Sequence, residues 1–193
     1  VPWRGRWETE LGGPTMGLGI HAMDHFLDIF GEWEEVRAMA GTLDRDIEVE
    51  DVSMALVRFK SGAFGSIVNS ALSPRQETYL RLDYQRATVD LTHLYGYTKD
   101  DWKLTLTPPA QDDALQQAWQ SAPPDVGSSH GAQLRAFVQD MDRGECPHTS
   151  GVEARRTLEF LTAIYKSAFT NQPIARDSIK EGDPYYQKIS GDR

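Results

Sequence analysis

The sequence predicts an α+β domain: a mostly antiparallel, open sheet of about six strands with helices packed on one face. Apolar residues recur with a helical period in residues 16–30 and again in residues 134–168. Between them, residues 35–107 alternate apolar and polar positions, as half-buried strands do. Only short connections separate the expected strands, whereas a parallel crossover needs about a dozen residues or more. We therefore expect antiparallel pairing.

The first expected helix covers residues 16–30. Its apolar residues are spaced by four, three, four and three positions, which places all of them on one face. They are Met16, Ile20, Met23, Leu27 and Phe30. Thr15 is a residue type that favours the N-cap, and Gly31 is one that commonly ends a helix. The helix should therefore begin just after Thr15 and end at Gly31.

Six strands are expected in the middle of the chain. They cover residues 35–43, 51–59, 63–71, 78–84, 86–92 and 102–107. Within the second strand, Val52, Met54 and Leu56 occupy every other position, so their side chains should share one face. Ser61-Gly62 lies between the second and third strands and predicts a hairpin turn there.

Two further helices are expected after a long loop at residues 108–129, which contains two Pro-Pro pairs. In the first helix, which Gly144 closes, four apolar residues follow helical spacing. They are Leu134, Phe137, Val138 and Met141. Ser150 and Glu153 form a capping-box pattern that opens the second helix.

A length of 193 residues suits one ordinary domain or a tight pair, and we expect the whole chain, residues 1–193, to form a single domain. Residues 173–193 are rich in charge and should form a tail on the surface of that domain. The chain opens on Val1 rather than Met, so we expect a piece of a longer polypeptide.

Composition excludes several classes of protein. The chain has 20 Lys and Arg against 29 Asp and Glu, which gives a net charge of −9. Such an acidic chain is a poor partner for nucleic acid and for anionic membrane surfaces, and we expect neither. No apolar run approaches the roughly 18 residues of a membrane helix. The single cysteine, Cys146, excludes an internal disulfide and suits a reducing compartment, so we expect a cytoplasmic protein.

Residues 12–25 hold glycines and histidines whose spacing allows three interpretations. In the first, Gly17-x-Gly19-x-x-Ala22 is a dinucleotide-binding loop. Such a loop works between a strand and a helix, where the pyrophosphate meets free backbone amides. The residues that precede Gly17 do not form a strand pattern, which argues against a cofactor loop at this place.

In the second interpretation, the helix binds a metal ion. His21 and His25 are four residues apart, so both imidazoles lie on one helix face and can chelate Zn²⁺. A third protein ligand is required, and no spacing singles out one of the remaining histidines. These are His93, His130 and His148. We therefore expect no metal site.

In the third interpretation, the segment is a substrate site at the start of the helix. The glycines at positions 12, 13, 17 and 19 allow a ligand to approach the backbone closely. His21 lies in the first turns, where the helix dipole favours the neutral imidazole that can accept a hydroxyl proton. A histidine that only packs against the helix or caps it explains the same pattern.

Several segments, taken in order, carry a family resemblance. They are Gly12-Gly13 through His21-x-x-Asp24, Phe30-Gly31, Glu35-Val36-Arg37-Ala38, Ile47-Glu48-Val49-Glu50-Asp51, Phe59-Lys60-Ser61-Gly62-Ala63-Phe64-Gly65, Gln133-Leu134-x-x-Phe137, Gly151-Val152-Glu153-Ala154-Arg155-Arg156-Thr157-Leu158-Glu159 and Ala163-Ile164-Tyr165-x-Ser167-Ala168. The series resembles the C-terminal domain of the Gfo/Idh/MocA oxidoreductases, the family of glucose–fructose oxidoreductase and inositol dehydrogenase. The family's first segment reads roughly Gly-Gly-Gly-x-x-x-Asp-x-Gly-x-His-x-x-Asp, and the resemblance covers nearly the whole chain.

The resemblance implies a two-domain enzyme that transfers hydride between NAD or NADP and a sugar, cyclitol or similar polyol. An N-terminal Rossmann domain, absent from this chain, would bind the cofactor, so this chain alone should bind none and should be inactive. The C-terminal domain would line the substrate pocket and form a homo-oligomer through the open face of its sheet. In that pocket His21 takes the position of a proton-relaying histidine, and Gly17 and Asp24 occupy substrate-site positions.

Two features depart from the family. Gly17 stands where the family has an aspartate, and no lysine of this chain precedes a proline, as the family's catalytic lysine usually does. Two alternatives to a dehydrogenase half therefore stay open. One is a non-catalytic sugar-binding or scaffold module with a retired site, and the other is an NAD-using glycosidase on the same fold.

Overall fold

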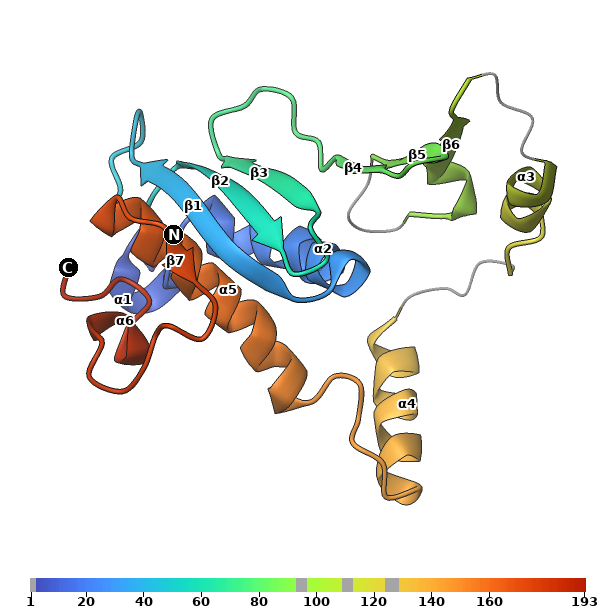
Figure 1. Cartoon of the computed structure of the whole chain (residues 1–193). Coiled ribbons are helices and arrows are strands. Elements are labelled where there is room, and N and C mark those ends of the chain that lie inside the picture. The colour runs from blue at the N-terminus through green and yellow to red at the C-terminus, as the bar shows by residue number, and fades with distance from the viewer. Residues whose placement is uncertain (1–2, 93–96, 109–112, 124–128) are drawn as a thin grey trace. The chain divides into compact units, whose positions relative to one another are not determined.

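The computed structural model describes residues 3–92, 97–108, 113–123 and 129–193 (Figure 1). The chain divides into two compact units. Unit 1 comprises Val1–Pro74 with Thr149–Arg193, and unit 2 comprises Arg75–His148. Both contain antiparallel strands together with helices, so the predicted α+β class is confirmed. The strands form one sheet of four and one of three, where we expected a single sheet of about six.

The sheet of unit 1 has the strand order β3-β2-β1-β7, and all its neighbours are antiparallel. Its strands are β1 Trp33–Gly41, β2 Val52–Phe59, β3 Phe64–Ser70 and β7 Ile174–Ala175. The predicted hairpin turn joins β2 to β3. There the amide of Gly62 donates to the carbonyl of Phe59, and Gly62 has a φ of 87°, which glycine adopts without strain.

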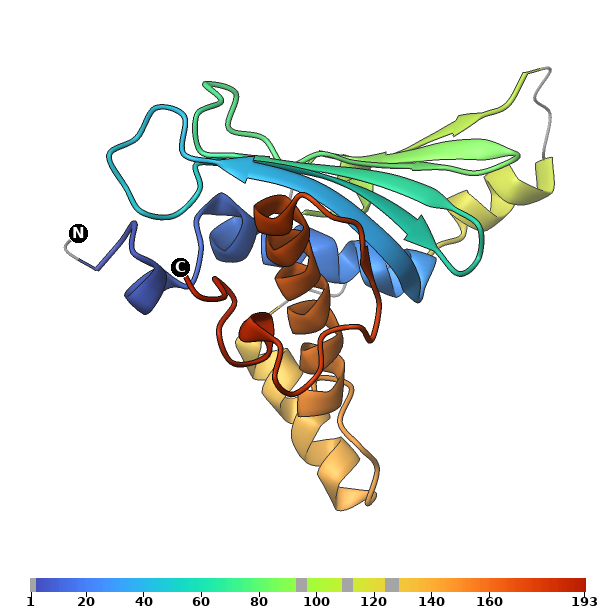
Figure 2. The same cartoon turned by 60° about the vertical axis from the view of Figure 1, so that its left-hand side comes forward.

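The long helices of unit 1, α2 Ile20–Phe30 and α5 Gly151–Thr170, cover one face of this sheet. Figure 2 shows both on the same side of the sheet, with no helix of the described part of unit 1 on the other side. The single-turn helices are α1 Trp7–Glu10 and α6 Pro184–Gln187. The predicted one-sided arrangement is thus present in unit 1.

The core of unit 1 lies between the covered face of the sheet and these helices. Alternate residues of β2, namely Ala55, Val57 and Phe59, point into it. On the helix side, Leu27 of α2 and Phe160 of α5 are fully buried. Burial of a side chain of this size contributes about 1.5–3 kcal/mol, so the core holds α2 and α5 firmly on the sheet.

The first helix starts differently from our expectation. Residues Thr15–Gly19 form a π-helical segment that runs directly into α2, and Pro14 rather than Thr15 precedes it. Thr15 is buried, and its hydroxyl oxygen lies 2.6 Å from that of Ser53, so it does not cap the helix. Gly31 ends α2 as predicted, with a φ of 78° and its amide bonded to the carbonyl of Leu27.

Unit 2 contains the second sheet, with the strand order β4-β5-β6. Its elements in chain order are β4 Leu80–Asp83, β5 Ala87–Leu91, the short 3₁₀ turn η2 Lys99–Asp101, β6 Trp102–Leu106, α3 Asp113–Gln120 and α4 His130–Asp142. The predicted loop at 108–129 was wrong where α3 lies. This segment is rich in alanine, leucine and glutamine, and their helix propensity prevails over the flanking prolines.

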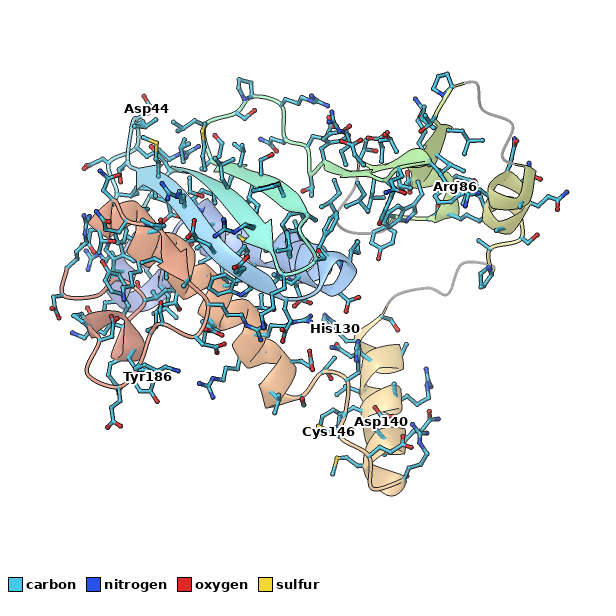
Figure 3. All side chains as sticks on the ribbon, in the orientation of Figure 1. Asp44, Arg86, His130, Asp140, Cys146 and Tyr186 are labelled. Carbon is cyan, nitrogen blue, oxygen red and sulfur yellow. The ribbon has the colours of Figure 1, made fainter. Side chains whose placement is uncertain are left out.

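Helix α4 of unit 2 has no buried residue. Its apolar residues Leu134, Val138 and Met141 are all exposed. Gly144 has a φ of 71° and closes the helical segment as predicted, and the exposed Cys146 follows it (Figure 3). None of the helices that the structure describes is long and apolar enough to span a membrane.

The C-terminal residues contribute to unit 1 where we expected a surface tail. Ile174 is buried and pairs with Val36 of β1, which makes β7 the edge strand of the sheet. Ser190 is also buried, whereas Tyr186 of α6 is exposed (Figure 3). At the start of α5, Ser150 occupies the predicted N-cap position, but its hydroxyl makes no capping hydrogen bond.

Candidate functional site

The three residues singled out by the sequence, Gly17, His21 and Asp24, lie on consecutive turns of the π segment and α2. Gly17 and His21 are exposed and about one turn apart. The carboxylate of Asp24 accepts a hydrogen bond of 2.5 Å from the hydroxyl of Thr157 in α5. All three residues are exposed, and Asp24 in addition ties α2 to α5 through this hydrogen bond.

The glycines of this segment serve different purposes. A Cβ at Gly13 would lie 1.8 Å from the carbonyl oxygen of Glu50, and a Cβ at Gly19 would lie 2.4 Å from Oδ1 of Asn69. Gly13 therefore needs glycine because a side chain would collide with backbone, whereas a side chain at Gly19 would require Asn69 and Met23 to move. A Cβ at Gly17 would meet no atom within 4 Å, so the surface one turn before His21 is open.

A buried carboxylate anchors the segment that carries these residues. Glu50 is only 2% exposed, and it accepts hydrogen bonds from the amides of Gly13 at 2.9 Å and Thr15 at 3.1 Å. The hydroxyl of Tyr165 donates a third bond to it at 3.0 Å. Burial raises the pKa of Tyr165, and the charge and hydrogen bond of Glu50 raise it further, so the phenol remains a donor. Three donors thus satisfy a carboxylate that would otherwise be costly to bury.

A second set of hydrogen bonds ties the π segment to the sheet. The hydroxyl of Thr15 lies 2.6 Å from that of Ser53 in β2, and the side-chain amide of Asn69 in β3 donates to the same Ser53 oxygen at 3.2 Å. The segment is thereby linked to two strands, and through Glu50 and Tyr165 to α5 as well. Such π-helical turns are rare and are often found at functional sites.

Asp51, the next residue after Glu50, anchors the connection between β1 and β2 in a similar way. Its buried carboxylate accepts hydrogen bonds of 2.8–3.0 Å from the amides of Leu43, Asp44 and Arg45 (Asp44 is labelled in Figure 3). Burial acts to raise the pKa of Asp51, but these amide hydrogen bonds outweigh it and lower the pKa below its ordinary value.

Sequence reasoning missed both of these carboxylates. One signal was that two acidic residues, Glu50 and Asp51, directly precede a strand whose alternate residues are buried. That placement puts at least one of them near the core, where a carboxylate needs several donors. The donors come from residues 13–15 and 43–45, and no local pattern connects these segments to residues 50 and 51.

The histidines do not form a metal site within the described part of the chain. No group of three or more His, Cys, Asp or Glu side chains suited to a metal ion occurs among the described residues. His25 is exposed on α2, whereas His130 and His148 belong to unit 2. His93 lies outside the described residues.

The dinucleotide-loop interpretation does not fit the geometry of residues 17–22. These residues lie within a continuous π- and α-helical stretch, which no strand precedes in the described residues. The amide of Gly17 is bonded to the carbonyl of Gly13 at 2.8 Å and is not free to meet a pyrophosphate. What this segment does offer is an exposed imidazole, His21, beside an open glycine turn.

Residues 1–93 match the GFO/IDH/MocA C-terminal domain. This match to the family's C-terminal domain covers 93 of the chain's 193 residues. The resemblance of the sequence motifs to this family is therefore confirmed.

Named relatives are similar over most of this chain. D-apiose dehydrogenase of Paraburkholderia graminis is 26% identical over a 174-residue alignment that covers 86% of this chain and 46% of the relative. The WlbA dehydrogenase of Bordetella pertussis, solved in complex with NADH and UDP-GlcNAcA, is 30% identical with a TM-score of 0.71. That match covers 91% of this chain and 49% of WlbA.

A levoglucosan dehydrogenase solved with NADH shares the fold, with a TM-score of 0.69 at 17% identity. The match covers 93% of this chain and 54% of that one. The chain thus spans about half the length of the relatives it matches.

Proposed function

We propose that this chain is the substrate-binding half of a cytoplasmic, NAD(P)-dependent oxidoreductase that acts on a sugar, cyclitol or similar polyol. The observation that carries this proposal is the exposed imidazole of His21 beside the open turn at Gly17, on a segment anchored by Glu50. The named relatives support it, because they are sugar dehydrogenases or were solved with NADH and a sugar nucleotide.

In this proposal, His21 holds and relays the proton of the substrate hydroxyl. A neutral imidazole can accept such a proton and, once protonated, can pass it on, which is what a relay requires. The hydride chemistry is supplied by the nicotinamide cofactor, which we propose an N-terminal Rossmann domain outside this chain binds. Asp24, bonded to Thr157, holds α2 against α5 so that His21 keeps its position.

The test is His21→Ala in the full-length protein, assayed with NAD and NADP on D-apiose, levoglucosan and UDP-GlcNAcA. We expect kcat to fall by about 10²- to 10⁴-fold, which is the usual contribution of a general acid–base group. His25→Ala, one turn further along the same helix and also exposed, is the matched control and should leave kcat nearly unchanged. Wild-type kcat in His21→Ala, or an equal loss in both variants, would overturn the assignment.

The cofactor assignment has its own test on the 193-residue chain. Titration calorimetry with NADH and NADPH should show no tight binding, because we propose that both bind outside it. Tight binding of either cofactor to the chain alone would contradict that division.

We also propose that two copies of the chain associate through the uncovered face of the β1-β2-β3 sheet. Large apolar side chains are exposed on this face, among them Met39 and Phe64, which are 75% and 78% exposed. An apolar patch of this kind marks an interaction surface. A second copy presents the same patch and needs no complementary charge, as expected for a two-fold interface.

One observation favours a different function. Gly17 stands where the family's pattern has an aspartate, and glycine cannot bind a substrate hydroxyl through a side chain. A non-catalytic sugar-binding or scaffold module would fit this change. Calorimetry of the full-length protein separates the two functions: a module binds a sugar without turnover in the presence of NAD or NADP, whereas an oxidoreductase reduces the cofactor.

A further inference from the structure

A pocket of about 450 Å³ lies within unit 2. Its aromatic lining comes from Tyr84, Tyr97, Trp102 and Trp119, and its aliphatic lining includes Leu82 and Val89. A volume of this size suits one small molecule. None of the residues that line it takes part in the function proposed above.

The polar atoms of the four aromatic side chains have no hydrogen-bond partner among the residues that the structure describes. Neither the hydroxyls of Tyr84 and Tyr97 nor the indole N–H groups of Trp102 and Trp119 make a hydrogen bond with a described residue. Tyr84 and Tyr97 are 52% and 38% exposed, so much of their aromatic surface also faces water. The pocket therefore combines flat apolar surfaces with hydrogen-bonding groups that are available to a ligand.

Among the described residues of the lining, Lys99 is the only charged one, and it is already engaged. Its ammonium donates to the carbonyl of Gln120 at 3.1 Å and to that of Ala122 at 3.2 Å, at the C-terminal end of α3. A cation at this end of a helix offsets the negative pole of the helix dipole. With this charge compensated and no carboxylate in the lining, the pocket favours an uncharged ligand.

We propose that this pocket binds an uncharged monosaccharide ring. A pyranose has a C–H face that stacks on Trp or Tyr, and a rim of hydroxyl oxygens that accept hydrogen bonds from indole N–H and phenol O–H groups. A purely apolar ring would leave those donors unpaired, and an anion would find no free charge. The proposal goes beyond the proposed function and does not rest on it, because His21 belongs to unit 1 and every lining residue belongs to unit 2.

The test is a titration of the 193-residue chain with methyl α-D-glucopyranoside and with D-xylose, followed by NMR of the tryptophan indole N–H signals. We expect the signals of Trp102 and Trp119 to shift in a saturable manner, with a Kd on the order of millimolar. The signal of Trp3, which is exposed in unit 1, should not shift and serves as an internal control. If the Trp102 and Trp119 signals do not move up to the solubility limit of either sugar, the proposal is wrong.

Two variants of Trp119 separate stacking from hydrogen bonding. Trp119→Phe keeps an aromatic face and loses the N–H, so the Kd should rise by about two- to fivefold. Trp119→Ala loses both the aromatic face and the N–H, and it should raise the Kd by about tenfold, as measured from the Trp102 signal. Far-UV circular dichroism confirms folding. Where Trp119→Ala does not fold, Trp119→Phe decides: an unchanged Kd in that variant overturns the proposal.

Two further titrations define the ligand class and its independence from unit 1. Uridine tests a flat aromatic ring, and uridine binding without sugar binding would refute a saccharide pocket. His21→Ala should leave the sugar-induced shifts of Trp102 and Trp119 unchanged. Loss of these shifts in His21→Ala would show that the signals report the site proposed in unit 1 and would overturn the separate pocket.

Discussion

The two faces of the sheet in unit 1 are both apolar, but only one is covered. On the covered face, Val57 and Phe59 pack against Leu27 and Phe160 and are nearly inaccessible to water. On the other face, Leu56 has the same character and is 64% exposed. The comparison teaches that alternation along a strand separates two faces but does not say which of them is the core. The helices decide that, because they cover one face only.

The uncovered face has a continuous apolar row across three strands. Met39 in β1 pairs with Met54 in β2, and Met54 pairs with Val68 in β3. All three side chains are more than half exposed. On the same sheet, Arg58 forms ion pairs with Glu34 and Glu35, so charged residues lie beside the apolar row. An apolar centre with a polar margin is typical of an interface between protein chains.

The largest expected effect compares one leucine on each side of this sheet. Leu27→Ala removes a fully buried side chain and should lower the free energy of unfolding by about 3 kcal/mol. Leu56→Ala removes an exposed one and should cost about 0.5 kcal/mol or less in the monomer. Urea denaturation at dilute concentration measures both. If both variants lost a similar amount of unfolding free energy, the side chain of Leu56 would have to be buried in the species measured.

A charge on the uncovered face tests whether a second copy covers it. Met54→Lys places an ammonium in the centre of the apolar row and should weaken self-association at least about tenfold, because the charge must lose its water. Sedimentation velocity over a range of concentrations measures this. Val152→Lys, at an exposed position on α5, is the control and should leave association unchanged. Equal association in Met54→Lys and the wild type would place the interface elsewhere.

The covered side of the sheet also holds a buried charge. Asp51 directly precedes β2 and is buried in the same alternating pattern as Ser53 and Ala55. Its lowered pKa means that the ionised form stabilises the fold above the ordinary aspartate value of about 3.9, and this contribution disappears as the pH falls through the folded-state pKa. Asp51→Asn should cost about 1–3 kcal/mol at neutral pH.

The check is the difference in unfolding free energy between wild type and Asp51→Asn, measured by urea denaturation from neutral pH down to pH 2. The difference should shrink below about pH 4. A difference that is independent of pH would mean that packing, rather than the charge, is responsible.

The smallest effect concerns the exposed ion pair at the start of β1. A hydrogen bond from Lys60 and an ion pair with Arg176 lower the pKa of Glu32 to about 2. Because this pKa is depressed, the stabilisation is present above the ordinary value of about 4.3 and is lost as the pH falls toward the folded-state pKa. Lys60→Met should raise the pKa of Glu32, as read from its carboxyl carbon signal by NMR. An unchanged titration would show that Arg176 alone determines it.

Local patterns predicted the parts of the fold that local forces decide. The spacing from Ile20 to Phe30 gave α2, and Ser61-Gly62 marked a turn that requires a positive φ. The π segment escaped prediction, because apolar residues at positions 16 and 20 fit an α-helix equally well. Within this segment, Thr15 makes hydrogen bonds to Glu50 and Ser53, which are distant in sequence.

The candidate site was likewise predictable only in part. His21 follows from the motif, and its exposure is a finding of the structure. The role of Glu50 could not be predicted, because its donors Gly13 and Tyr165 are 37 and 115 residues away in sequence. Such contacts form only when α5 packs against the sheet. A short stretch of sequence carries no information about that packing.

The open turn at Gly17 has a consequence for how this protein evolves. Gly17 lies in helical backbone that any residue adopts, and a Cβ there meets nothing within 4 Å. A change of one base converts a glycine codon into an aspartate codon, so one mutation places a carboxylate a turn away from His21 without disturbing Glu50 or the core. This side chain can therefore be added or removed by a single substitution while the hydrogen bonds of Glu50 beneath it stay intact.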